Sequence, residues 1–207
     1  MHTYYDKTNV MKIILASSSP GRSASLKKLG LPFHTTSPSI DETPLDGEDS
    51  ISLVKRLSIA KAQTLSPDSE TIIIAGDQVL SVDDCILSKP QTFSNAQSQL
   101  RQCSGKIVYS HSGMCVYMPH KRFLHYSLTT AEAHYRELSE NIISSYLTID
   151  EPYQCAGSIR FESSGHLLLK KLVCSDTFAI CGLPLHQLVT ILLSQGITLD
   201  KLLSKSV

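Results

Sequence analysis

Two short runs of consecutive apolar residues place the strongest constraint on how this chain folds. They are Lys12–Ala16 (KIILA) and residues 71–75 (TIIIA). Continuous apolar runs of this length are typical of parallel strands buried on both faces, because strands with one exposed face alternate apolar and polar side chains. Helices must then cover both faces of the sheet. The two runs therefore predict an α/β fold.

Helix and strand patterns alternate along the rest of the chain. Asp49 or Ser50 can cap a long helix whose apolar positions follow the helical period, and Gly30 can end an earlier helix. Further strands are predicted at residues 31–36, 79–82, 106–117 and 123–134, and further helices at 23–29, 94–103, 139–147 and 185–193. The order β-α-β-α-β-α-β-β-α-β-β-α predicts an α/β or mixed sheet.

Charge and hydropathy exclude several classes of protein. Lys+Arg and Asp+Glu both number 19 among 207 residues, so the formal net charge is zero. A dedicated nucleic-acid binder would carry a basic field. No apolar run approaches the ~20 residues that a membrane-spanning helix needs. The sequence thus predicts a globular protein that binds neither nucleic acid nor membrane.

The N-terminus and the cysteines bear on domain organisation and location. Residues 1–10 are polar and lack the apolar middle of a signal peptide, so we interpret them as an extension before a single domain at 11–207. The six cysteines include no CxxC pair, which argues against a common zinc-site spacing. A chain without a secretory signal keeps its cysteines reduced. We therefore expect a cytoplasmic protein.

Small hydroxyl residues and an arginine follow the first apolar run, in the sequence ASSSPGR at residues 16–22. Unpaired backbone N–H groups at a strand-to-helix turn attract anions. The guanidinium of Arg22 adds a fork of donors suited to phosphate or carboxylate. Ser17 and Arg22 are therefore candidates for a phosphate cradle. An ordinary turn that carries a surface arginine is the alternative.

Acidic residues stand at two positions where they could hold a metal ion. Asp77 follows the apolar run 71–75 within the sequence GDQ, and ligands of open α/β sheets gather beyond the carboxyl ends of strands. Glu42 lies in a loop between two prolines. A carboxylate can bind a divalent cation or orient water. A turn aspartate that bonds its own backbone and a solvated loop are the alternatives.

Two lysines and a third carboxylate complete the set of candidates. Lys61 lies on an otherwise apolar helix face, where it either extends to water or meets a phosphate as a point charge. Lys89 precedes a proline and belongs either to a surface turn or to a phosphate contact. Glu162 is either exposed or accepts hydrogen bonds from a guanine edge, which presents adjacent donors.

Seven short segments, each weak alone, stand in one order over nearly the whole chain. They are LASSSPGR (15–22), DET (41–43), AKA (60–62), GDQV (76–79), KP (89–90), CAGS (155–158) and GLPL (182–185). The combination resembles the Maf family of nucleotide pyrophosphatases. Without that resemblance, we interpret the proline of GLPL, which lies near a helix start, as structural packing.

The resemblance implies a Maf/ITPase-like fold, with a mixed, twisted sheet flanked by helices and two lobes around a central cleft. It implies a hydrolase acting on phosphoric anhydride bonds, which converts a nucleoside triphosphate to the monophosphate and pyrophosphate with a divalent metal cation, Mg²⁺ or Mn²⁺. A role in removing modified nucleotides from the cytoplasmic pool also follows from the resemblance. A homodimer is also implied, by the resemblance alone.

The resemblance also suggests roles for the candidate residues. The phosphates would contact Ser17, Arg22, Lys61 and Lys89. Asp77 would position or deprotonate the attacking water, and Asp77 and Glu42 would hold the cation.

Three positions bear on the base of the nucleotide. Gln78 and Glu162 are similar to the subgroup that acts on 7-methyl-GTP, whereas the dTTP/UTP subgroup typically has Thr and Gln there. Gly21 departs from both, because its position usually holds Trp in the first subgroup and Arg in the second. We predict 7-methyl-GTP as the substrate. The alternatives are dTTP or UTP, and a non-catalytic nucleotide-sensing or partner-binding protein.

Overall fold

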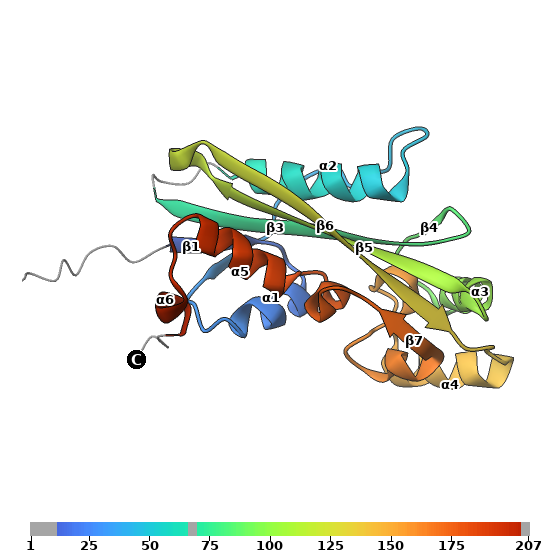
Figure 1. The fold of residues 1–207 in the computed structure, drawn as a ribbon. Coiled ribbons are helices and arrows are strands. Elements are labelled where there is room, and N and C mark those ends of the chain that lie inside the picture. Colours follow the sequence, from blue (N-terminus) through green and yellow to red (C-terminus); the bar gives the residue numbers. More distant parts are fainter. Residues whose placement is uncertain (1–11, 66–69, 204–207) are drawn as a thin grey trace, which may run out of the picture.

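A computed structural model describes residues 12–65 and 70–203, which form one mixed sheet with helices on both faces (Figure 1). The strands are β1 (Lys12–Ala16), β2 (His34–Thr36), β3 (Thr71–Val82), β4 (Cys85–Leu87), β5 (Ile107–Met118), β6 (Phe123–Tyr135) and β7 (Leu169–Val173). The helices are α1 (Pro20–Lys27), α2 (Ser50–Gln63), α3 (Phe93–Cys103), α4 (Glu140–Asp150), α5 (Leu185–Ser194) and α6 (Leu199–Leu203). The extension predicted at residues 1–10 lies outside the described residues.

The sheet combines a parallel and an antiparallel half. Its strand order is β2-β1-β3-β5-β6-β7, and β4 also pairs with β3. β1 runs parallel to both β2 and β3, whereas β5, β6 and β7 pair antiparallel with their neighbours. The predicted mixed α/β sheet flanked by helices is thereby confirmed.

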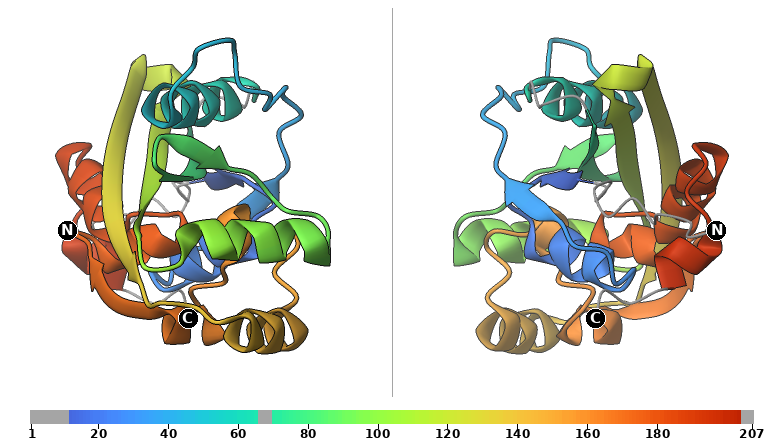
Figure 2. Two further views of the ribbon diagram at one scale, coloured as in Figure 1. Left: turned by 90° about the vertical axis from the view of Figure 1, so that its right-hand side faces the viewer. Right: turned by 90° about the vertical axis from the view of Figure 1, so that its left-hand side faces the viewer.

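The apolar run of β3 is buried because a helix covers each face of the sheet. Ile72 and Ile74 belong to a core cluster that also contains residues of α1 and α5. Ile73 and Ala75, which point the other way, pack with Ala62 of α2. Figure 2 shows α2 on one side of the sheet and α1 and α5 on the other. Consecutive apolar side chains of β3 thus pack alternately against the helices on the two faces of the sheet.

A second large core cluster lies toward the other end of the long strands. It joins Leu80 and Val82 of β3 to residues of α3, α4, β6 and β7. Because β3 contributes to both clusters, it connects two lobes of the molecule, as do β5 and β6. Across residues 12–65 and 70–203, no helix has the length and hydropathy needed to cross a membrane.

The secondary structure departs from the prediction mainly at five places. α1 begins at Pro20 and not at residue 23, because Ser19 caps it and proline is favoured in the first helical turn. β2 begins only at His34, after Pro32, which has no backbone N–H to donate. A single strand, β7, lies between α4 and α5 where two were predicted, since much of that stretch forms 3₁₀ turns. The short strand β4 was not predicted; it pairs with β3 through a tight turn at residues 83–84.

The fifth difference concerns the strand that contains Asp77. The sequence predicts a strand at residues 71–75 that ends at the segment GDQ, and a second strand segment at 79–82, but β3 continues without a break from Thr71 through Val82. The reason is β5, which pairs antiparallel with β3 over the whole stretch from Ile73 to Ser81. Pairing with a partner more than thirty residues later in the chain overrides the local turn signal of the sequence GDQ.

Candidate functional site

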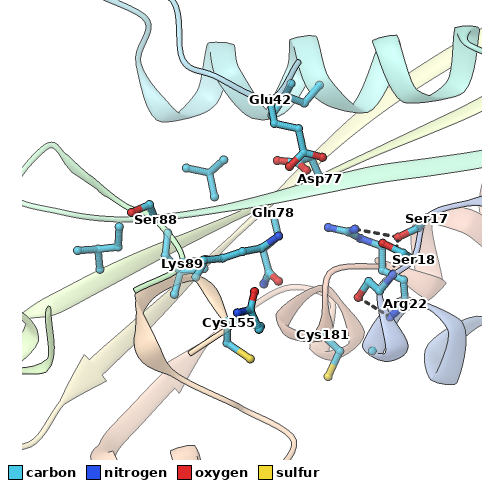
Figure 3. Close-up of a pocket in the computed structure, with 18 of the residues that line it drawn as sticks. Ser17, Ser18, Arg22, Glu42, Asp77, Gln78, Ser88, Lys89, Cys155 and Cys181 are labelled. Carbon is cyan, nitrogen blue, oxygen red and sulfur yellow. Dashed lines mark hydrogen bonds between the residues drawn. The ribbon is translucent and has the colours of Figure 1, made fainter. Parts of the chain in front are cut away.

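A cavity of about 1120 Å³ lies between the two lobes, and every residue predicted from the sequence for the site lines it. These residues are Ser17, Gly21, Arg22, Glu42, Lys61, Asp77, Gln78, Lys89 and Glu162. In Figure 3, Glu42 lies close to Asp77, with Lys89 on one side and Ser17 and Arg22 on the other. Residues from six separate parts of the chain therefore share one space.

The cavity lies at an interrupted edge of β3. On this edge β1 pairs with β3 up to Ala75, and β4 pairs with it from Leu80. In the described part of the chain, residues 76–79 have a strand neighbour only on the other edge. Asp77 and Gln78 both line the cavity, although adjacent residues of a strand point to opposite faces. This arrangement places the cavity at the gap in the edge and not on one face of the sheet.

The turn after β1 presents hydrogen-bond donors and a helix N-terminus to the cavity. Ser17 is buried, and its Oγ accepts hydrogen bonds from Ser19 N at 3.1 Å and from Arg22 Nη1 at 3.1 Å. Ser19 caps α1, and its hydroxyl accepts from Arg22 N at 3.4 Å. The partial positive charge of a helix N-terminus favours bound anions. The turn thus has the chemistry of a phosphate cradle.

Arg22 contributes a buried positive charge. It is 9% exposed, and its Nε donates to Gly182 O at 3.0 Å. Burial lowers the pKa of Arg22, while the charges of Asp77 and Glu42 raise it in part. Among residues 12–65 and 70–203, no carboxylate lies within ion-pair distance of this guanidinium. A buried cation of this kind is suited to a negatively charged ligand.

Lys61 lies between the two acidic candidates. Its Nζ is 2.6 Å from Asp77 Oδ1 and 2.6 Å from Glu42 Oε1. The side chains of Lys61 and Asp77 are 8% and 11% exposed, whereas that of Glu42 is 50% exposed. Burial raises the pKa of Glu42, but the hydrogen bond and charge of Lys61, with Lys89 and Arg22, lower it overall. Glu42 is therefore held as a carboxylate.

The backbone of Asp77 is fixed by helix α2. Asp77 N donates to Ser58 Oγ at 3.0 Å, and Ser58 Oγ donates to Val54 O at 2.7 Å. This N–H belongs to the edge of β3 that has no strand neighbour, so Ser58 replaces a sheet partner. A Cβ at Gly113 of β5 would lie 2.5 Å from Ser58 Oγ, so a glycine there lets the helix approach this closely.

Gln78 connects the site to the segment before α5. Its Nε2 donates to Ser110 Oγ at 2.9 Å and to Ile180 O at 3.0 Å. The neighbouring Gly182 has a φ of +85° and accepts the hydrogen bond from Arg22. The GLPL segment therefore does more than pack, because its first residue holds Arg22 while Leu183 and Leu185 are in the core.

Lys89 and Glu162 line more exposed parts of the cavity. Lys89 lies just after β4, and its charge contributes to the low pKa of Glu42. Glu162 lies near Cys181, whose pKa is raised first by burial and then by the charge of Glu162. These two residues therefore lie at the cavity without the fixed contacts that hold Lys61 and Arg22.

Glu42 and Asp77 fit a divalent cation of the Mg²⁺ type. Their two oxygens lie within hydrogen-bond distance of one nitrogen, so they already converge on a cation. One ammonium between two carboxylates also leaves an excess of negative charge. Mg²⁺ is commonly held by one or two carboxylates together with substrate phosphates. In the described part of the chain, no group of three or more His, Cys, Asp or Glu side chains could hold a metal ion without such help.

Ser58, Ser110 and the Gly182 carbonyl are site residues that sequence reasoning missed. Ser58 stands three positions before Lys61 and so shares its helix face, which is the one signal that could have indicated it. The other two act on residues that are distant in sequence. Nothing local in the chain marks Ser110, and Gly182 is marked only as part of the segment GLPL, without its contact to Arg22.

The Ser58→Ala variant tests whether Ser58 supports the backbone of Asp77. It leaves the buried Asp77 N–H without a partner, so we expect the free energy of unfolding to fall by about 1–3 kcal/mol. Any catalytic role of Asp77 should weaken as well. Chemical denaturation measures the first effect, with Ser52→Ala on the exposed face of α2 as the control. Equal stability of the two variants would contradict the assignment.

Comparisons with known proteins identify the family. The family model described as Maf-like protein matches residues 12–195. A 7-methyl-GTP pyrophosphatase of Hydrogenovibrio crunogenus is 42% identical over 182 residues, which is 87% of this chain and 91% of that protein. Relatives of the same name from Colwellia psychrerythraea and Vibrio parahaemolyticus are 40% and 38% identical over 89% of this chain, and over 93% and 96% of their own lengths. The chain thus belongs to the Maf family.

Proposed function

We propose that this protein hydrolyses 7-methyl-GTP to 7-methyl-GMP and pyrophosphate. The observation that carries the proposal is the contact of buried Lys61 with buried Asp77 and half-exposed Glu42, beside the anion-binding turn of Arg22. The two buried cations, Arg22 and Lys61, suit a triphosphate, and the buried carboxylate of Asp77 beside them suits an attack by water. The three relatives named above are 7-methyl-GTP pyrophosphatases, which supports the choice of substrate.

The triphosphate would lie along the turn of residues 17–22. Ser17 and the N-terminus of α1 would donate hydrogen bonds, and Arg22, Lys61 and Lys89 would offset the phosphate charge. Preorganised donors and cations favour the transition state, because charge on the phosphate oxygens shifts as the bond breaks. Lys61 would turn from its carboxylate partners toward the incoming phosphates.

Asp77 would position and deprotonate the attacking water. The water oxygen forms a bond to the α-phosphorus, and the bond from that phosphorus to the oxygen bridging the α- and β-phosphates breaks. The proton of the water passes to the Asp77 carboxylate, and pyrophosphate leaves with the bonding electron pair. In the absence of substrate, Lys61 Nζ lies 2.6 Å from Asp77 Oδ1 and holds this carboxylate in position.

A divalent cation, Mg²⁺ or Mn²⁺, would be held by Asp77 and Glu42. When bound, it supplies positive charge to the phosphate oxygens. Because two carboxylates converge at Lys61 in the described part of the chain, substrate phosphates and water would complete the coordination. Removing the cation with EDTA should therefore suppress turnover, and adding Mg²⁺ should restore it.

A pyrophosphate-release assay tests the function as a whole. The panel comprises 7-methyl-GTP, GTP, dTTP and UTP, each with Mg²⁺, with Mn²⁺ and with EDTA. We expect kcat/KM to be highest for 7-methyl-GTP in the presence of metal. A preference for dTTP or UTP would replace the substrate, and nucleotide binding without any release would favour a sensing protein.

The Glu162→Gln variant tests how the base is read. N7-methylation leaves the guanine ring cationic, so a carboxylate would both neutralise it and accept its N–H donors. We expect kcat/KM of the variant to fall about tenfold for 7-methyl-GTP, since a hydrogen bond to a charged group contributes about 1.5–3 kcal/mol. For dTTP we expect kcat/KM to fall less than about fivefold. Equal losses on both substrates would exclude Glu162 from base recognition.

A further inference from the structure

One corner of the cavity, beside the phosphate cradle, is lined by Gly21, Cys181 and Glu162. A Cβ built on Gly21 would lie 3.2 Å from Cys181 O, so these two backbones are in close proximity. Cys181 is also near enough to Glu162 for that charge to affect its thiol. Gly21 contributes no side chain to this corner. The base of a nucleotide whose phosphates lie on residues 17–22 would extend toward it.

The cavity has a single aromatic residue on its wall. The chain contains no tryptophan, five phenylalanines and eight tyrosines. Of these, Phe161 alone lines the cavity in the described part of the chain. It stands next to Glu162, so a ring and a carboxylate enter the cavity wall from the same loop. Any stacking of a base on an aromatic side chain in this site therefore falls to Phe161.

The loop that carries Phe161 is fixed from behind by helix α4. Arg160 N donates to Tyr146 Oη at 2.9 Å, and Ser163 Oγ donates to Asp150 Oδ1 at 3.0 Å. Gly165 N donates to Arg160 O at 3.1 Å, which closes the loop on itself. Phe161 is half-buried and packs against the second core cluster. The ring is thus held in place before a ligand arrives, which lowers the entropy cost of stacking.

We infer that Phe161 is the stacking surface for the base and that, with Glu162, it selects a cationic purine. The inference rests on the proposed function and assigns a specificity residue within it. A cation over an aromatic face gains about 0.5–2 kcal/mol, depending on how far it is desolvated. The neutral ring of GTP gains only the ordinary stacking part. Phe161 therefore contributes more to binding 7-methyl-GTP than to binding GTP.

Kinetics of the Phe161→Leu variant test this preference. Leucine retains apolar packing on the core but removes the ring. We expect KM for 7-methyl-GTP to rise about tenfold and KM for GTP to rise about threefold, with kcat little changed, because stacking is made equally in the ground and transition states. Phe93→Leu is the matched control, since Phe93 is an exposed phenylalanine of α3 outside the cavity.

The Phe161→Trp variant gives a readout that is independent of catalysis. The chain has no tryptophan, so this variant carries a single fluorescent indole. Titration with 7-methyl-GMP, the expected product, should quench its emission strongly, and GMP should quench it less. The Phe93→Trp variant should respond to neither. Far-UV circular dichroism of all four variants shows whether each is folded.

The possible failures are distinguishable. Wild-type protein that releases no pyrophosphate from 7-methyl-GTP would overturn the proposed function, whatever Phe161 does. Wild-type turnover combined with an unchanged ratio of KM values in Phe161→Leu would overturn the inference alone. An indole in Phe161→Trp that 7-methyl-GMP does not quench, in a protein that still turns over 7-methyl-GTP, would overturn it too.

Discussion

Pyrophosphate release by the Asp77→Asn variant is expected to fall by a factor of about 10³, because a general base contributes about 10²–10⁴ and electrostatic stabilisation a similar amount. Asparagine has the shape of aspartate but neither accepts the proton of the water nor carries the charge that holds a cation. The backbone N–H of residue 77 keeps its bond to Ser58, and Lys61 keeps Glu42 as a partner. The loss should therefore be in kcat, and the fold should be retained.

Asp84→Asn is the matched control for this experiment. Asp84 lies in an exposed turn with a φ of +62°, a conformation that asparagine also tolerates. Steady-state kcat with 7-methyl-GTP and thermal melting should be measured for both variants. If Asp77→Asn retained kcat within tenfold of wild type while Asp84→Asn was normal, another residue would have to serve as the base.

The Lys61→Met variant is expected to lose about 10²-fold in turnover. Methionine retains much of the apolar stem of lysine, but the ammonium that neutralises phosphate charge is gone. Glu42 and Asp77 would then face one another without the ammonium between them, and their mutual repulsion would disfavour the arrangement. Lys55→Met on the same helix is the control, because Lys55 is exposed and lies outside the cavity.

The double variant Lys61→Met/Asp77→Asn separates a shared role from two independent ones. Residues that act as a unit show losses that are far from additive. Since Lys61 and Asp77 are in direct contact at 2.6 Å, we expect the double variant to be about as slow as Asp77→Asn alone. Losses that multiply would show that lysine and aspartate act on different steps.

The elements of this fold were predictable where the local pattern agrees with the tertiary structure. The strand Lys12–Ala16 has the predicted bounds, and Asp49 caps α2 as expected. The candidate residues also converge on one cavity, as the resemblance to the Maf family implies. These features follow from hydrophobic periodicity and from short motifs, both of which are visible in a single sequence.

The features that could not be predicted depend on contacts between distant parts of the chain. β3 passes through Gly76 and Asp77 because β5 pairs with them, although the sequence there is typical of a turn. Gln78 bonds to Ile180, which is 102 positions away. The sequence around Ser58 is that of an ordinary helix. Its role arises because the gap in the edge of β3 leaves the N–H of Asp77 without a strand partner, and Ser58 accepts that hydrogen bond. Local propensity carries no information on any of these contacts.

The two carboxylates of the site differ in mechanical support. Asp77 is part of a strand that crosses both lobes and is hydrogen-bonded to β5 on either side of it, so bending there would break sheet pairing. Glu42 is carried by a loop between β2 and α2, and half of its side chain is exposed. A nucleotide in the cavity therefore contacts one carboxylate that the sheet holds in place, that of Asp77, and one that is carried by a loop, that of Glu42. Any adjustment of the two carboxylates to a bound nucleotide should thus come from Glu42 and not from Asp77.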